Sequence, residues 1–421
     1  MAASHFRVFI GLGGQKVFSL VAAMLISILL ARMLGPEGYG LYVFVSAFIP
    51  LASLPITGGL PQLLTREIGR HGQNASLNLE ASVGGAMRLS RRVTIFFLMV
   101  CAAGLVSFES MSQPFLVCLC LLCVPFLAFE ASYNGIIRGL QKPGHAEFPK
   151  QVFQPVILGV ALLLLVLLGD LTPFYALVAL LVATAASTLC SLVIYRRLKP
   201  ITPEKGERRN TTSLSLKTVA SFSAIALFAS LNAQIGILVL GWLDQTTGAA
   251  ALRIAERAGQ LAILPLTIIN LMIAPRVAAA FQEKRTDELQ RLTTRAGRLS
   301  FLLTLPALPI IWFYGDWLIA FLFGEAYVTE TLDAVIVLVA GQTAGLFFGS
   351  VWPLLIMTGH ERQALNRLIM SCGLNLFLCL WLAPIYGAAG AALAAALSLI
   401  IWKFSFSVDI KKRLKINTNL L

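Results

Sequence analysis

Charged residues are scarce in this sequence: they make up 13% of its 421 residues, against about 25% in an ordinary soluble domain. Apolar residues make up 57%, and the mean hydropathy is +0.81. Apolar runs of about 20 residues recur along the whole chain, the length that an α-helix needs to cross a hydrocarbon core of about 30 Å. The short alternating strands of a membrane β-barrel are missing. The sequence therefore predicts an all-α integral membrane protein.

Histidine and cysteine are too few and too scattered for a metal or catalytic site. The four histidines all fall in polar connections, and the seven cysteines all fall in apolar runs. Cys120 and Cys123 form a lone C-x-x-C inside an apolar helix, without the second pair that a zinc site needs. A phosphate-binding loop pattern is also missing. We expect no metal, no cofactor, no catalytic residues and no nucleotide-driven pump.

About twelve stretches are long enough to span a membrane as helices. Six lie in the first half of the chain, at 8–34, 40–64, 88–108, 114–138, 149–169 and 172–195. Six more follow a polar stretch, at 219–243, 248–275, 297–323, 331–357, 364–384 and 386–407.

Basic residues are almost absent from every second connection between these spans. Lys and Arg gather at both ends of the chain and in the connections after spans 2, 4, 6, 8 and 10, whereas Arg32 alone lies in the other connections. Because basic residues mark the cytoplasmic side, we expect both termini in the cytoplasm. The net charge of +13 is then a signal of topology, and we expect no nucleic-acid partner.

Residues that recur at a constant spacing indicate an internal duplication. The spacing is about 210 residues early in the chain, as for Gly38 and Gly248, and about 220 later, as for Gly139 and Gly359. Both halves begin on the same side of the membrane, which predicts a parallel repeat. We expect a six-helix half over 1–199, a cytoplasmic linker over 200–217, and a six-helix half with a basic tail over 218–421.

Three motifs carry a resemblance to a known family. The first runs from Leu30 to Tyr42 and reads LARMLGPEGYGLY, in which Pro36 and three glycines predict a tight turn. The others are Leu240–Asp244 with Gly248–Ala255 and Ala274–Ala278, and Phe323–Tyr327, which reads FGEAY. Together with length and span count they resemble the Wzx-like oligosaccharide flippases of the multidrug/oligosaccharidyl-lipid/polysaccharide (MOP) exporter superfamily. One departure is Ala249–Ala251, where the first half has Gly-x-Tyr.

The resemblance implies a MATE-like fold of two parallel six-helix bundles around a central, often cationic cavity. It also implies a function: the flipping of an undecaprenyl-diphosphate-linked oligosaccharide (an O-antigen, capsule or exopolysaccharide repeat unit) from the inner to the outer leaflet of the bacterial inner membrane by alternating access. Membrane lipids, a glycan polymerase and other export proteins are the partners that it implies.

Two other classes of function are compatible with such a chain. A drug or cation antiporter of the same superfamily would need buried acidic residues for ion coupling, and only Glu130 and Glu256 qualify. A membrane glycan polymerase or ligase would need reactive groups in a long outward loop, whereas the outward loops here are short and contain no histidine.

The main candidate site lies in the eighth predicted span. Arg253, Glu256 and Arg257 occupy positions i, i+3 and i+4 and share one face of a helix. Arg257 is about 14 Å along that helix from Gly248, near the middle of the bilayer. Charges at that depth must face protein or water. They form either an ion pair with one surplus arginine held by packing or a cationic lining for a diphosphate or acidic sugars.

Further candidates are polar residues in other spans. Glu130, Asn134 and Arg138 share one face of the fourth span; Glu130 either pairs with a basic neighbour or titrates during transport, and Arg138 is also a plausible cytoplasmic anchor. Lys16 either extends to the interface or lines the cavity. Asn232 is a further candidate, although hydrogen bonding between helices explains such a residue equally well.

Glycines at four-residue spacing predict close helix packing rather than a binding site. They are Gly135 and Gly139 in the fourth span, and Gly341, Gly345 and Gly349 in the tenth.

Overall fold

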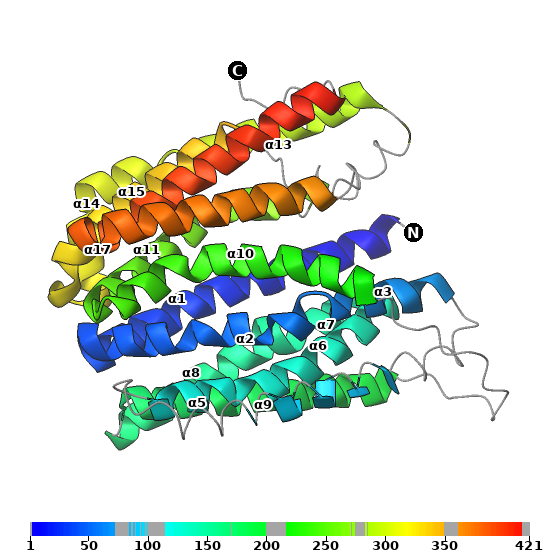
Figure 1. Ribbon diagram of the computed structural model, residues 1–421, viewed down its shortest axis with the longest axis horizontal. Helices are drawn as coiled ribbons and strands as arrows, with labels where there is room; N and C mark the ends of the chain where they lie inside the picture. Colours follow the sequence, from blue (N-terminus) through cyan, green and yellow to red (C-terminus); the bar gives the residue numbers. More distant parts are fainter. Residues whose placement is uncertain are drawn as a thin grey trace. The chain divides into compact units, whose positions relative to one another are not determined.

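The computed structural model (Figure 1) describes residues 2–71, 114–169, 171–198, 216–270, 285–348 and 361–414, with residues 84, 85, 87, 88, 90–92, 94–96, 99, 272, 273 and 283. Over these residues the chain is helical and contains no strand. The prediction of an all-α protein is confirmed.

The helices follow one another with short connections. In the first part of the chain they are α1 (Ala2–Ser46), α2 (Phe48–Thr57), α3 (Leu60–His71), α5 (Pro114–Leu121), α6 (Cys123–Gly139), α7 (Pro143–Phe148), the π-helix η2 (Pro149–Phe153), α8 (Gln154–Leu168) and α9 (Pro173–Leu198). In the second part they are α10 (Leu216–Trp242), α11 (Thr246–Ala262), α13 (Thr286–Thr304), α14 (Ala307–Phe323), the 3-10 helix η3 (Glu325–Tyr327), α15 (Val328–Leu346) and α17 (Glu361–Leu414).

Within the described residues, seven helical stretches are long and apolar enough to cross a membrane. They are Gly11–Leu54, Phe115–Gly139, Pro143–Leu168, Pro173–Leu198, Ser223–Trp242, Glu288–Phe323 and Leu365–Val408. The last of these contains most of two predicted spans, and the first contains parts of two. The count of twelve stays a prediction, because the predicted spans 88–108, 248–275 and 331–357 fall partly outside the described residues.

Residues with positive φ break the longest helices. Gly35 (φ 69°) interrupts α1 and Gly387 (φ 55°) interrupts α17; this region of backbone space favours glycine because a Cβ is strained there. The tight turn predicted around Pro36 is confirmed. Asp244 (φ 57°) lies between α10 and α11, 209 residues after Gly35, and Gly387 lies 218 residues after Gly169 (φ 78°). These are the spacings of the internal repeat; the predicted halves themselves stay a prediction.

The chain forms two compact units. Unit 1 comprises residues 1–22 and 45–230, and unit 2 comprises residues 23–44 and 231–421. Helix α1 therefore passes from unit 1 into unit 2 after Ala22, and the chain returns to unit 1 at Val45. Helix α10 crosses in the same way after Ser230.

The core of unit 1 forms where α3 packs against α6. Its buried members include Ile56, Leu60, Leu64, Ile68, Ala128, Ala131 and Ile136. A Cβ on Gly135 would lie 2.7 Å from Cα of Pro61, and one on Gly139 would lie 2.6 Å from Cβ of Ile68. The predicted packing role of this glycine pair is confirmed.

In unit 2, α11 packs against α15 and α17 (Figure 1). Gly259 of α11 lies against the Leu338 side chain of α15, and Gly341 of α15 lies against Ala396 of α17. Gly345 of α15 meets the side chain of Lys403. The packing predicted for Gly341 and Gly345 is thus confirmed, and Gly349 lies outside the described residues.

We expect the substitution Gly135→Leu to destabilise unit 1 by about 3 kcal/mol or more, because the new side chain meets the α3 backbone and not a flexible side chain. Gly159→Leu is the matched control, since a Cβ there meets no atom within 4 Å. Thermal unfolding in detergent measures both. Equal melting temperatures for the two variants would contradict the close packing of α3 on α6.

Candidate functional site

Helix α11 is buried on all sides at its start and carries charged residues on one side further along. Gly248, Ala249, Ala250 and Ala251 are consecutive and buried, so the first turn of the helix is enclosed by its neighbours. The alanines at 249–251, where the first half has Gly-x-Tyr, belong to this buried turn. Arg253, Glu256 and Arg257 are only partly buried. The sequence thus folds locally into an amphipathic helix that holds three ionisable groups beside an apolar core.

The charge of Arg253 is already paired. Its Nη1 donates to Oε2 of Glu256 at 2.9 Å, and its Nη2 donates to Oε1 of Gln234 on α10 at 3.0 Å. Gln234 fixes the guanidinium from a second helix. Arg253 and Glu256 therefore form a neutral pair whose geometry is set by α10 and α11 together.

Arg257 keeps a surplus positive charge. Its Nη1 donates to Oε1 of Gln260 at 3.1 Å, and its buried Nε has no hydrogen-bond partner among the described residues. Salt bridges within 4 Å in the described part of the chain do not include Arg257. Since Gln260 is neutral, this face of α11 carries a net charge of one and a guanidinium with unused donors.

A tyrosine from far earlier in the sequence is within electrostatic reach of this group. Tyr39 is 1% exposed, belongs to the part of α1 that packs in unit 2, and interacts electrostatically with Arg257, Arg253 and Glu256. Tyr39 was not among the predicted site residues, whereas Gln234, like Asn232, is a polar residue of a predicted span for which the sequence favours hydrogen bonding between helices. The repeat offset of 210 could have pointed to Tyr39, because it aligns the first outward turn, which contains Tyr39, with the start of α11.

Glu130 is buried, with 4% of its surface exposed, and Oγ of Ser187 on α9 donates to its Oε1 at 2.6 Å. Lys150 and Glu147 are within electrostatic reach, yet the described residues place no base within salt-bridge distance of the carboxylate. Its partner is a hydroxyl group from a neighbouring helix. Whether Glu130 titrates during transport stays a hypothesis.

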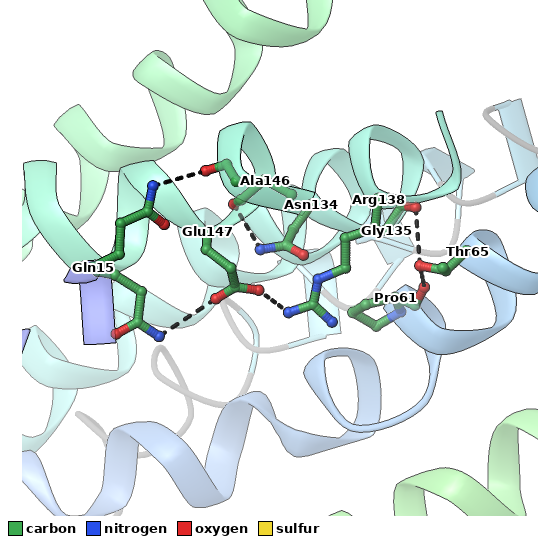
Figure 2. A network of polar contacts seen from close by, with 10 residues as sticks. Gln15, Pro61, Thr65, Asn134, Gly135, Arg138, Ala146 and Glu147 are labelled. Carbon is green, nitrogen blue, oxygen red and sulfur yellow. Dashed lines mark hydrogen bonds and ion pairs between the residues drawn. The ribbon is translucent and has the colours of Figure 1, made fainter. Parts of the chain in front are cut away.

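Asn134 and Arg138 join a polar network around α7 (Figure 2). Asn134 donates to the carbonyl oxygen of Ala146 at 2.9 Å, and Arg138 forms an ion pair with Glu147. Gln15 of α1 donates to the carbonyl oxygen of Gly144 at 3.1 Å. In these contacts Asn134 and Arg138 hold the turn between α6 and α8.

The remaining predicted residues are in different places. Nδ2 of Asn375 on α17 donates to Oδ1 of Asn232 on α10 at 2.9 Å, so the hydrogen bond between helices that the sequence allowed for Asn232 is present. Lys16 is half-buried in α1, and its role stays a prediction. Of the eight predicted residues, Arg253, Glu256 and Arg257 lie together in unit 2; Glu130, Asn134 and Arg138 lie on α6 in unit 1.

Lys403 is a further cation that the sequence reading assigned to the cytoplasmic tail. It lies inside the apolar stretch Leu365–Val408, and its Nζ is 3.1 Å from the position that a Cβ of Gly345 would occupy. No salt bridge of the described residues includes it. Its place inside the predicted span 386–407, four residues before that span ends, was a signal available from the sequence. Over the described residues no group of three His, Cys, Asp or Glu side chains could hold a metal ion.

Residues 9–281 match the model of a family described as polysaccharide biosynthesis protein. The chain is 24% identical over 400 residues to a putative O-antigen transporter from Shigella flexneri, covering 88% of this chain and 89% of the relative.

Solved structures share the fold over almost the whole chain. An inward-facing multidrug resistance MATE family transporter of the MOP superfamily matches with a TM-score of 0.74 at 14% identity, covering 94% of each chain. The lipid II flippase MurJ in an inward closed conformation matches with a TM-score of 0.73 at 15% identity, covering 94% of this chain and 86% of that one. A MOP superfamily transporter from Pyrococcus furiosus matches with a TM-score of 0.68 at 15% identity, covering 97% and 95%.

These matches confirm the predicted MATE-like fold, and the apolar helices make this a multi-pass membrane protein. Since the family model covers more than half of the chain, the protein belongs to the polysaccharide biosynthesis protein family.

Proposed function

We propose that this protein flips an undecaprenyl-diphosphate-linked oligosaccharide from the inner to the outer leaflet of the bacterial inner membrane by alternating access. It acts as a transporter and not as an enzyme. Both of its termini lie in the cytoplasm, as the distribution of basic residues predicts. A glycan polymerase and other export proteins are the partners that would receive or process the cargo.

Support for this class of cargo comes from family and relatives. The family is one of polysaccharide biosynthesis, and one relative is described as a putative O-antigen transporter. A structural neighbour, MurJ, is described as a lipid II flippase. A lipid-linked glycan needs a protected path for its polar headgroup, while its polyprenyl tail can remain in the bilayer.

The observation that carries the proposal is the surplus charge of Arg257. A cation inside a membrane helix costs at least about 2.5 kcal/mol unless it faces water or an anion, and guanidinium groups bind phosphate oxygens with two parallel hydrogen bonds. Arg257 keeps an unused buried donor, Nε, next to a pair that is already neutral. A diphosphate supplies both the negative charge and the acceptors that this group lacks among its described neighbours.

The same charge disfavours the antiporter alternative. A hydrophobic cation would be repelled by Arg257, whereas an anionic headgroup would be attracted. Glu256, one of two candidate ion-coupling carboxylates, is engaged by Arg253. The polymerase or ligase alternative would need reactive groups in a long outward loop, whereas the outward loops that the sequence predicts are short and contain no histidine.

Complementation tests the proposed function in cells. A bacterium that makes a surface glycan but lacks its own flippase for the repeat unit should regain the glycan when it expresses this chain together with the glycosyltransferases of its source. Accumulation of the lipid-linked repeat unit on the cytoplasmic side despite expression of the membrane-inserted protein would contradict the proposal.

A further inference from the structure

One face of helix α13 is packed inside unit 2. The hydroxyl of Thr304 donates to the carbonyl oxygen of Ala262 on α11 at 3.0 Å, and the ring of Phe301 lies 4.7 Å from that of Phe347 at the end of α15, measured between centroids. These contacts hold α13 in one rotation about its axis. The residues on the packed face recur every three or four positions and are at most 4% exposed: Leu289, Thr293, Ala296, Ser300 and Thr304.

The opposite face of α13 carries arginines at its start and leucines at its end. Arg291, Arg295 and Arg298 are exposed and follow one another by four and three residues, so they line up along the helix. The same spacing continues to Leu302 and Leu305, which are 65% and 42% exposed. We call these five residues the arginine–leucine face. Exposed leucines inside a predicted membrane span indicate that this face meets lipid.

The next helix indicates where the arginine–leucine face crosses the membrane surface. Helix α14 exposes Trp312, Tyr314 and Trp317, each by 62% or more, and such side chains gather at the membrane–water interface. Arg298 precedes Trp317 by 19 residues, which is about 28 Å along a helix and close to the thickness of the hydrocarbon core. Arg298 therefore lies at the other boundary of that core, the inner one by the distribution of basic residues. Arg291 lies about 10 Å further out, among the lipid headgroups.

Two of these arginines are not engaged by acidic side chains of the described residues. The salt bridges there include neither Arg291 nor Arg295, whereas Arg285, just before the helix, pairs with Glu283 and Glu288. A guanidinium group matches the geometry of phosphate oxygens and forms two parallel hydrogen bonds with them. The face thus offers cationic donors at the depth where phospholipids carry their phosphate groups.

The first repeat presents an arginine in the same way. The offset of 210 aligns Arg88 with Arg298 and Ser90 with Ser300. Both arginines are exposed, and both serines are 0% exposed. An exposed arginine beside a buried serine is therefore common to the two repeats.

We propose that the arginine–leucine face binds an anionic phospholipid of the inner leaflet, with the phosphate against the arginines and the acyl chains along Leu302 and Leu305. The site is additional to the proposed function and does not depend on its cargo. The five residues offer cations and apolar carbon atoms, but none of the amide, hydroxyl or aromatic groups that recognise sugars, which favours a phospholipid over a glycolipid. A zwitterionic phospholipid carries its own cation, so it gains less from three arginines.

Titration of the purified full-length protein in detergent tests the site, with bound lipid counted by native mass spectrometry. Phosphatidylglycerol is the anionic probe, and phosphatidylcholine with the same acyl chains is the zwitterionic one. The parent should bind phosphatidylglycerol at least tenfold more tightly. Arg291→Gln together with Arg295→Gln should weaken that binding at least tenfold, because each arginine near an anionic lipid surface strengthens binding about fivefold.

The matched control is Arg196→Gln together with Arg197→Gln. These arginines are exposed at the end of α9, and their replacement removes the same charge, so affinity for phosphatidylglycerol should stay within threefold of the parent. Thermal unfolding without added lipid verifies that each variant is folded. Equal losses in the two double variants, or equal affinity of the parent for both lipids, would overturn the proposal, because binding would then follow net charge or apolar contact alone.

A competition experiment separates a phospholipid site from a site for the cargo. Undecaprenyl diphosphate is added to protein that is half-saturated with phosphatidylglycerol. We expect it to displace the phospholipid no more effectively than an equal concentration of phosphatidylglycerol does. Displacement at a tenfold lower concentration, lost in the Arg291→Gln and Arg295→Gln double variant, would assign the face to the cargo and show that the phospholipid proposal is wrong.

Discussion

Transport is expected to fall about 100-fold when Arg257 is replaced by glutamine. The substitution removes the surplus charge and the unused Nε donor, and a charge-assisted contact of this kind contributes about 2–3 kcal/mol, or about a factor of 100. The double variant Arg253→Gln with Arg257→Gln should abolish transport, because Glu256 then remains as a partly buried carboxylate without its partner. Restoration of a surface glycan in cells is the measurement.

The matched control is Arg285→Gln. Arg285 is exposed and pairs with Glu283 and Glu288, so the same charge change at that position should leave transport within about twofold of the parent. Membrane-inserted protein is quantified for every variant. Full complementation by the double variant would show that the cargo does not use these arginines.

Lys403→Met is expected to stabilise the folded protein and, at the same time, to reduce its transport activity. The described residues place no acid beside Lys403 in its apolar surroundings, and removal of such a cation gains about 2–3 kcal/mol. If the cation is retained because it binds the anionic headgroup, transport should fall at least tenfold. Thermal unfolding and complementation measure the two effects.

Lys403→Arg is the control for this prediction, because it keeps the positive charge on a side chain of similar length. It should retain more transport than Lys403→Met without the gain in stability. A methionine variant that is both more stable and fully active would mean that Lys403 has no part in transport.

The sequence predicted the helical class and the fold because both follow from local properties. Apolar runs define spans wherever they are uninterrupted, and the turn at Gly35 was visible from Pro36 and its glycines. The close approaches at Gly135 and Gly341 followed from four-residue spacing. The contacts between helix ends could not be predicted from the sequence. They join residues far apart in the chain: Arg32, for example, donates to a carbonyl oxygen of α14 that lies 290 positions later.

The candidate site was predicted in part. The i, i+3, i+4 pattern correctly placed Arg253 beside Glu256, since that spacing alone sets the distance between two side chains on a helix. It could not show that Gln234 completes the pair, that Arg257 keeps an unused donor, or that Tyr39 is within electrostatic reach of both arginines. Asn134 and Arg138 share their helix face with Glu130, yet their partners come from the turn after that helix. The periodicity of the sequence does not predict the conformation of such a turn.

The most direct measurement of the central claim is translocation by the purified protein in proteoliposomes. A diphosphate-linked glycolipid, labelled in its sugar, should become accessible to an impermeant glycan-modifying reagent on the opposite face, at a rate that depends on Arg257. A hydrophobic cation in the same vesicles should not be moved. Transport of the cation, without movement of the glycolipid, would contradict the account and favour an antiporter.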